Sequence, residues 1–256
     1  MPKTTTIKYK YELSDSMIIK SKDMICLIDS SVTNWDYMDD FLQALCNVDI
    51  SYYMYSPAHT GNADRVREEV YTERIFAYEF YHQYRCIMSS DENKERYEGL
   101  FLNGEQTKTK EVVPDLEKCA PDLVMHRERG ADVPNGQLWL CEIKMAKSHN
   151  PLSDITKIHD MVSLHFKENI FLFAGACKER LLLYIKNKVE IGEISLENDG
   201  NVICICSSCK CVTDKKYNYE LYVDCHRLSE LIKDQTDKDS LEKVLKKKKE
   251  DDYVLY

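Results

Sequence analysis

The sequence lacks the features that would place the chain in a membrane or direct it to secretion. No apolar stretch approaches the roughly 18–20 residues that a membrane helix needs, and Ile170–Ala176 is among the longest. The first residues, Met1–Thr4, contain no apolar segment of the kind that begins a secretory signal. We therefore expect a cytoplasmic protein with no membrane association.

The chain also lacks an excess of positive charge. It carries 35 basic and 44 acidic residues, which gives a formal net charge of −9. Such a balance argues against non-specific binding along a nucleic-acid backbone. The sequence has no internal repeat. Its 256 residues, 43% hydrophobic and 31% charged, suffice for one large domain or two small ones with a proper core.

Cysteine is abundant, but its pattern does not indicate disulfides. Eleven is an odd number, and a cytoplasmic chain meets reducing conditions. Most of these cysteines stand singly among apolar residues and are expected to behave as small buried hydrophobes. One group of four thiols could close a tetrahedral zinc site: Cys204, Cys206, Cys209 and Cys211. The competing interpretation is a strand, Val202–Cys206, that turns at Ser207–Ser208 into a second strand.

Hydrophobic periodicity predicts an α/β chain in three segments. Residues 1–60 form an N-terminal extension of strands around a helix, and its role is unknown. Residues 62–176 contain a long helix, three strands, a helix and a strand. Residues 177–256 add a helix, a cysteine-rich hairpin and a charged helix, which can pack on the same domain. A strand, a crossover helix and a strand in succession imply a parallel pair within a mixed sheet.

The expected elements have approximate bounds in the sequence. Strands are predicted over 5–12, 24–28, 48–55, 99–106, 120–127, 137–145 and 169–175. Helices are predicted over 35–45, from 62 or 64 to 87, and over 153–167 and 178–188. The lysine run Lys246–Lys249 is predicted to be an exposed helix end or tail.

The strand over 137–145 ends with an acid and a base two residues apart. Side chains alternate across a strand, so Glu142 and Lys144 share one face, and the apolar residues between them face a core. Charged groups that close an otherwise apolar strand are costly unless they are partnered. Asp122 heads the preceding strand and comes beside Glu142 if the two strands pair through the turn Gly130–Gly136.

Two neighbouring carboxylates repel each other, and a divalent cation satisfies both. Their hard oxygen ligands suit Mg²⁺, and Mn²⁺ is the alternative ion. A lysine beside such a metal can orient or deprotonate a water molecule and stabilise charge on a phosphoryl group. Asp122, Glu142 and Lys144 are therefore the parts needed for metal-assisted hydrolysis of a phosphodiester.

This pattern resembles the motif of the PD-(D/E)XK nuclease superfamily, in which a Pro-Asp pair is followed by an acid, any residue and a lysine. Five residues match the motif: Pro121, Asp122, Glu142, Ile143 and Lys144. The resemblance extends to the element order αβββαβ and covers residues 62–176. It implies a restriction-endonuclease-like core, with a mixed central sheet flanked by helices, and the activity of a Mg²⁺-dependent DNA endonuclease.

The resemblance also implies roles for individual residues. Asp122 and Glu142 would hold the metal, the carbonyl of Ile143 would be a further ligand, and Lys144 would activate or position the attacking water. The superfamily often adds an acid from the first helix. Glu73 falls inside the apolar stripe of the predicted helix, so we expect it to complete the site. Glu79, on the opposite side of the helix, is the second candidate.

Four more residues are candidates for contact with the nucleic acid. Two lie on the first helix and two lie beyond the motif strand: His82, Gln83, Lys147 and Lys157. For each of them the alternative is a structural or solvated side chain. The expected partner is DNA, with RNA left open. A homodimer is also left open, because two copies often make paired cuts across a duplex.

Two other functions fit the same sequence. One is a non-catalytic nucleic-acid-binding or assembly protein that keeps the nuclease-like fold. The other is a zinc-binding interaction module built on the four clustered cysteines. If the protein is a nuclease, then restriction, phage defence, a mobile element or repair would all be compatible settings.

Overall fold

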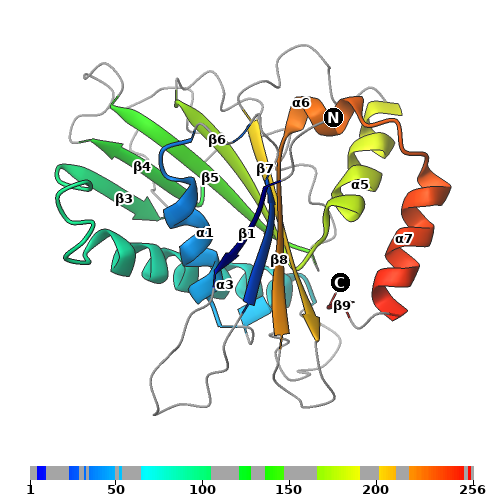
Figure 1. Ribbon diagram of the computed structural model, residues 1–256, viewed down its shortest axis with the longest axis horizontal. Helices are drawn as coiled ribbons and strands as arrows, with labels where there is room; N and C mark the ends of the chain where they lie inside the picture. The colour runs from blue at the N-terminus through cyan, green and yellow to red at the C-terminus, as the bar shows by residue number, and fades with distance from the viewer. Residues whose placement is uncertain are drawn as a thin grey trace.

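The structure, a computed structural model, is an α/β arrangement with helices on both faces of one mixed sheet (Figure 1). It describes residues 5–9, 23–28, 32, 35–49, 52–53, 65–104, 121–127, 136–146, 166–190, 202–211, 219–250 and 253–254. No helix in these ranges has the length and hydropathy of a membrane-spanning segment.

The strands and helices follow one another along the chain with short connections between several of them. The strands are β1 (Thr5–Tyr9), β2 (Asp23–Ile28), β3 (Leu100–Gly104), β4 (Leu123–Arg127), β5 (Gln137–Met145), β6 (Glu168–Ala174), β7 (Val202–Cys211), β8 (Tyr219–Arg227) and β9 (Tyr253–Val254). The helices are α1 (Met38–Asn47), α3 (Arg65–Met88), α5 (Lys178–Glu190), α6 (Leu228–Lys233) and α7 (Lys238–Glu250).

The strands within the described ranges form a nine-stranded sheet in the order β1-β2-β8-β7-β6-β5-β4-β3, with β9 paired to β7. Strands β3, β4 and β5 are antiparallel neighbours, whereas β5, β6 and β7 run parallel. The predicted parallel pair, β5 with β6, is thus confirmed. Most of the crossover helix expected over 153–167 lies outside the described residues. Because β1, β2, β7 and β8 join the same sheet, the terminal segments share it with residues 62–176.

The sheet separates two hydrophobic clusters, one on each face. On one face, α1 and α3 pack on the odd-numbered side chains of β5. There Trp139 lies 5.4 Å from Tyr84 and 5.9 Å from Phe41 between ring centroids. On the other face, α5 and α7 cover Phe171 and Phe173 of β6. Nearly every residue of β6 is buried, as expected for a central strand covered on both faces.

Two local predictions were wrong. The strand expected over 48–55 is contradicted by Tyr52 and Tyr53, which are helical. Tyr53 is buried there against Phe76, and its hydroxyl donates a 3.3 Å hydrogen bond to the carbonyl of Leu45. The turn expected at Ser207–Ser208 does not form, because both serines pair with β8 and β7 continues to Cys211. Neighbouring strands satisfy the backbone groups that an isolated pair of serines would use in a turn.

Candidate active site

Antiparallel pairing of β4 with β5 brings Asp122 beside Glu142. Leu123 pairs with Cys141, so Asp122, one residue earlier, comes opposite Glu142, one residue later. Asp122 Oδ2 accepts a 2.6 Å hydrogen bond from the backbone N–H of Ile143. The Glu142 side chain is buried, with the residue 7% exposed. Two acids that lie twenty residues apart in the chain therefore meet at one end of two paired strands.

The two carboxylates both affect the pKa of the Cys141 thiol. Burial raises the pKa of Cys141 well above its usual value, and the negative charges of Asp122 and Glu142 raise it further. Asp122 and Glu142 therefore both lie close enough to this buried group to act on it electrostatically. A concentration of negative charge of this kind favours a bound cation.

Lys144 follows Glu142 on the same face of β5. Glu142 and Lys144 are in register with Phe171 and Phe173 of β6, which belong to the α5 and α7 face. Cys141 and Ile143 belong to the opposite cluster, under α1 and α3. The alternation predicted for this strand is thus confirmed.

Glu73 on α3 meets Lys144. The distance from Lys144 Nζ to Glu73 Oε2 is 3.2 Å, and that to Oε1 is 3.4 Å. The two side chains are 18% and 19% exposed. Helix α3 brings Glu73 to this position because Phe76, Phe80 and Tyr84, at helical spacing after it, are buried against the core. Lys144 is on the α5 and α7 face of β5, whereas α3 covers the other face. The described β4 residues pair with β5 only up to Cys141, so beyond that point the long Lys144 side chain can pass the end of β4 to reach Glu73.

The other sequence candidates lie elsewhere. Gln83 Nε2 donates a 2.6 Å hydrogen bond to Glu79 Oε1, which joins two residues of the same helix. His82 is exposed, and its Nε2 lies 3.8 Å from the Cys86 thiol one turn further on. Neither contact connects these residues to the carboxylates of β4 and β5. Lys147 and Lys157 lie outside the described residues.

Arg180 is a neighbour of the site that sequence reasoning missed. It lies in the first turn of α5, and its Nη2 donates a 3.2 Å hydrogen bond to the carbonyl of Ala146, directly after β5. No local pattern could identify it, because the contact depends on the parallel register of β5 with β6. That register sets Met145 beside Ala174, and α5 begins four residues after Ala174.

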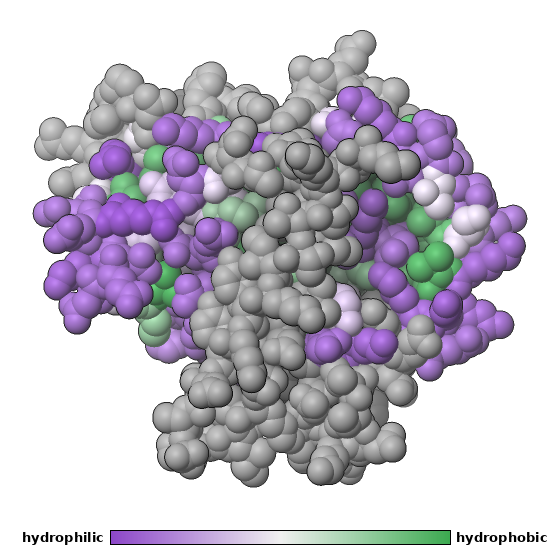
Figure 2. All heavy atoms as spheres, in the orientation of Figure 1, coloured by the Kyte–Doolittle hydropathy of each residue, from purple (hydrophilic) through white to green (hydrophobic). Residues whose placement is uncertain are grey.

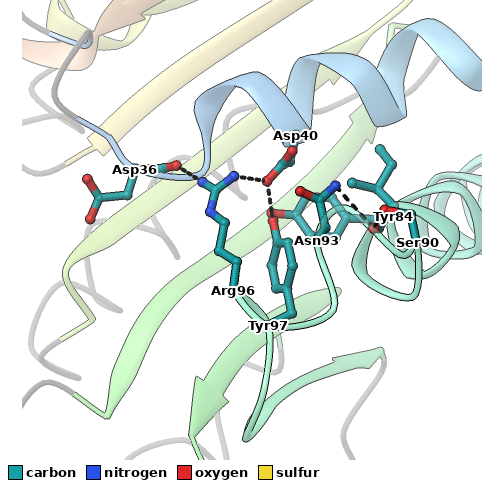
Figure 3. A network of polar contacts seen from close by, with 8 residues as sticks. Asp36, Asp40, Tyr84, Ser90, Asn93, Arg96 and Tyr97 are labelled. Atoms are coloured by element: carbon teal, nitrogen blue, oxygen red, sulfur yellow. Dashed lines mark hydrogen bonds and ion pairs between the residues drawn. The ribbon is translucent and has the colours of Figure 1, made fainter.

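A second polar cluster joins α1 to the end of α3 and the turn that follows (Figure 3). Asp40, 6% exposed, accepts hydrogen bonds of 2.6 Å from Arg96 Nη1 and 2.5 Å from the Tyr97 hydroxyl. Arg96 also donates to the carbonyl of Asp36. The Tyr84 and Tyr97 hydroxyl oxygens are 3.1 Å apart. Burial raises the pKa of Tyr97, as does its neighbour Tyr84, so its hydroxyl keeps the proton that it donates.

The clustered cysteines do not all lie on one face of the sheet. Because β7 is continuous, Cys204 and Cys206 lie on the α5 and α7 face, whereas Cys209 belongs to the opposite cluster. Cys204 and Cys206 also differ from Cys209 in the helices that cover them. One tetrahedral zinc site that uses thiols from both faces of a sheet is geometrically excluded.

The donor set at the end of β5 suits a hard cation with an incomplete protein shell. Across the described ranges, no three His, Cys, Asp or Glu side chains form a ready-made metal site. Asp122, Glu142 and the carbonyl of Ile143 offer oxygen donors from two adjacent strands. Mg²⁺ is commonly held by one or two carboxylates and keeps several water molecules, so these residues fit Mg²⁺ better than Zn²⁺.

Comparison with protein-family models, with curated protein sequences and with solved structures finds no match to this chain. Its function must therefore be inferred from the chemistry of the residues at the end of β5. Those residues are Asp122, Glu142, Lys144 and Glu73.

Proposed function

We propose that the protein is a Mg²⁺-dependent nuclease that hydrolyses phosphodiester bonds in DNA at a centre of the PD-(D/E)XK type. One observation carries the proposal. Asp122 lies beside Glu142 at the end of two paired strands, and Lys144, on the same face as Glu142, forms an ion pair with Glu73 of α3. These are the residue types that metal-assisted phosphodiester hydrolysis requires, at one end of one sheet.

The order and direction of the elements support a restriction-endonuclease-like core. A long helix, α3, precedes three antiparallel strands, β3, β4 and β5. Strand β6 follows and runs parallel to β5, which requires a crossover connection between them. The candidate acids and the lysine lie on β5 and at the start of β4, as the superfamily pattern implies.

A Mg²⁺ or Mn²⁺ ion at this position would polarise the phosphoryl group and lower the pKa of a bound water molecule. Asp122 and Glu142 would hold the ion, with the carbonyl of Ile143 as a further oxygen donor. The hydrogen bond from the Ile143 N–H to Asp122 fixes that carboxylate relative to β5. This contact fixes the spacing between the two acids before a substrate arrives.

Lys144 would act on the phosphoryl oxygens and the attacking water. Its ammonium group can stabilise the negative charge that develops on phosphorus-bound oxygens, or orient the water for attack. Glu73 holds this ammonium group at the strand end, within 3.2 Å. Glu73 would therefore position Lys144, and the loss of either charge should lower the rate of the chemical step.

The Glu73–Lys144 contact favours one alternative function. An ion pair that satisfies Lys144 within the protein is also what a non-catalytic nucleic-acid-binding protein with this fold would keep. Such a protein would bind DNA equally well in chelator and in Mg²⁺. A nuclease would cleave DNA in Mg²⁺ or Mn²⁺ and would not cleave it in chelator.

The proposal can be tested with purified protein on supercoiled plasmid, linear duplex, single-stranded DNA and RNA, with Mg²⁺, Mn²⁺ or chelator. We expect metal-dependent cutting of DNA. Lys144→Ala should lower the rate by about 100-fold or more, the scale of removing one electrostatic contact from a transition state. Lys167→Ala is the matched control, because Lys167 is exposed at the opposite end of the motif strand, where its N–H binds Gln137.

Circular dichroism and a urea unfolding curve should show that both variants are folded. A folded wild-type protein that cuts none of these substrates with either metal would overturn the proposal. Equal cutting by Lys144→Ala and Lys167→Ala would remove Lys144 from the mechanism.

A further inference from the structure

Helices α5 and α7 pack side by side in opposite directions (Figure 1). At one end, Lys248 Nζ lies 2.7 Å from Glu179 Oε2. At the other end, Lys238 Nζ lies 2.6 Å from Glu190 Oε2. The C-terminal turn of α7 therefore lies beside the N-terminal turn of α5.

The N-terminal turn of α5 lies at the C-terminal ends of β5 and β6, which is the side of the sheet where the candidate centre lies. Helix α5 begins shortly after β6 ends, and β6 ends in register with Met145 of β5. The hydrogen bond from Arg180 to the carbonyl of Ala146 ties this turn to the end of β5. The C-terminal turn of α7 is thus placed at the edge where Glu142 and Lys144 lie.

That turn of α7 carries a local excess of positive charge. Residues 243–250 contain five lysines and one glutamate, in a chain with a net charge of −9. Lys248 points inward to Glu179, whereas Lys246, Lys247 and Lys249 are exposed. At the right of the view, where Figure 1 places α7, hydrophilic side chains surround a small hydrophobic patch (Figure 2). The negative end of the helix dipole favours a cation in the last turn. That effect alone does not account for three exposed lysines in this part of the helix.

We propose that Lys246, Lys247 and Lys249, here named the α7 basic surface, bind the phosphate backbone of the nucleic acid outside the scissile bond. The inference rests on the proposed function, which requires a polyanion to reach the end of β5. It also explains how an acidic chain can hold that polyanion, because the lysines gather at the edge of the sheet that carries the centre.

The composition of α7 favours nucleic acid over a lipid surface as the partner. A helix that lies on a membrane buries an apolar face in the lipid. The one fully buried apolar side chain of α7, Leu241, is already packed in the cluster with α5 and β6. Val244, 39% exposed, does not form an apolar face by itself. The exposed lysines are therefore suited to phosphates in water.

Binding through lysines and phosphates has a measurable dependence on salt. Each phosphate neutralised contributes about 0.9 to the slope of log K against log salt concentration on duplex DNA. Removing three lysine contacts should therefore lower that slope by about 2 to 3.

The test compares two triple variants that change net charge equally. The first is Lys246→Gln, Lys247→Gln and Lys249→Gln. The control is Arg85→Gln, Lys94→Gln and Lys233→Gln, which removes basic side chains that are exposed elsewhere on the surface. Binding of a fluorescent 20-base-pair duplex is measured over a range of salt in Mg²⁺, in a Lys144→Ala background so that the duplex stays intact. KM and kcat are measured in the otherwise wild-type background.

We expect the α7 variant to lose at least about tenfold in affinity at low salt and to show the smaller slope. Its KM should rise while its kcat is retained, and the control should match the parent. Equal affinity, slope and KM for the two triple variants would overturn the inference. So would an α7 variant that loses binding to vesicles of phosphatidylcholine and phosphatidylserine but keeps its affinity for DNA.

The two proposals fail in different ways. If the wild-type protein cuts DNA and the α7 variant behaves like the control, then the inference fails and the nuclease stands. If the wild-type protein binds DNA through the α7 basic surface but never cuts it, then the proposed nuclease activity is refuted and the proposed DNA-binding surface is supported.

Discussion

Two polar clusters in this molecule each join an acid to a base from a distant part of the chain. Asp40 and Arg96 are 56 residues apart and 2.6 Å from each other, and Glu73 and Lys144 are 71 residues apart and 3.2 Å from each other. In the first cluster, one acid meets one base and the hydroxyl of Tyr97. In the second, Glu73 meets Lys144 at the strand end where Asp122 lies beside Glu142.

The difference between the two sets of neighbours distinguishes a structural cluster from a candidate active site. In the Asp40 cluster, the Arg96 guanidinium and the Tyr97 hydroxyl satisfy the buried carboxylate. Around the end of β5, Glu73, Asp122 and Glu142 face a single lysine among these four side chains. Under the proposed function, a bound cation would stabilise these neighbouring carboxylates. The predictions that follow test this distinction.

The largest expected effect is on catalysis. Glu142→Gln should lower the rate of metal-dependent cleavage by about 100-fold or more, because the cation loses a charged ligand. The free energy of unfolding without metal should be unchanged or higher, because the repulsion between Glu142 and Asp122 is removed. Cleavage kinetics and urea unfolding in chelator measure the two quantities. A variant that is both destabilised and fully active would reverse the assignment of roles.

The opposite result is expected in the Asp40 cluster. Tyr97→Phe removes a donor from a buried carboxylate, which should lower the free energy of unfolding by about 1–3 kcal/mol. Cleavage per folded molecule should be retained, because the Asp40 cluster joins α1 to the turn after α3 and is not part of the candidate site at the end of β5. Tyr37→Phe is the matched control, because Tyr37 is half-buried and contacts the same Arg96 through the face of its ring. Equal stability of the two variants would show that the Tyr97 hydrogen bond contributes little.

Asp224 on β8 extends the comparison to a further acid, near α5 and α7. Burial raises the pKa of Asp224 from 3.8 to about 6, against the opposing effect of Lys248. The folded protein therefore binds more protons than the unfolded chain between these pH values, so stability falls as pH rises through this window and stays lower above it. The loss attributable to this group is about 2 kcal/mol after a discount for partial exposure.

Urea unfolding at several values between pH 4 and pH 7 measures this contribution. Asp224→Asn should lack it, so the stability of the wild-type protein should fall relative to that of the variant over this range. Burial of Glu179 is outweighed by its hydrogen bond and ion pair with Lys248, which lower its pKa. Glu179 therefore contributes stability that is lost as the pH falls through its folded pKa, in the wild type and in Asp224→Asn alike. Parallel pH profiles would contradict the shift.

The smallest effect is expected at an exposed ion pair. Lys94 and Asp91 are 2.9 Å apart, but their side chains are 61% and 95% exposed. Lys94→Ala should change the free energy of unfolding by less than about 0.5 kcal/mol. A larger loss would mean that distance alone, without burial, is enough to make an ion pair stabilising in this protein.

The parts of the structure that the sequence predicted well depend on local periodicity. The bounds of β5, Gln137–Met145, were predicted correctly because an apolar run with alternating faces ends at a turn. The position of Glu73 followed from the 100° spacing of the apolar stripe on α3. Both features are set by neighbours in the sequence, so short-range patterns contain them.

The features that sequence reasoning missed depend on long-range pairing. Ser207 and Ser208 favour a turn by themselves, yet β8 holds them in a strand. Arg180 reaches the site only because α5 follows a strand parallel to β5. Asp40, Arg96 and Tyr97 follow no local pattern, because partners from α1 and the turn after α3 meet only in the folded chain.

The most direct test of the central claim is cation binding without nucleic acid. Electron paramagnetic resonance of free Mn²⁺ can be followed as protein is added, for the wild type, Asp122→Asn, Glu142→Gln and Tyr97→Phe. If the acids at the end of β5 form the site, then wild type and Tyr97→Phe will remove Mn²⁺ from solution equally, added Mg²⁺ will displace it, and the two carboxylate variants will bind far less. Equal binding by all four proteins, or no binding by the folded wild type, would contradict the account.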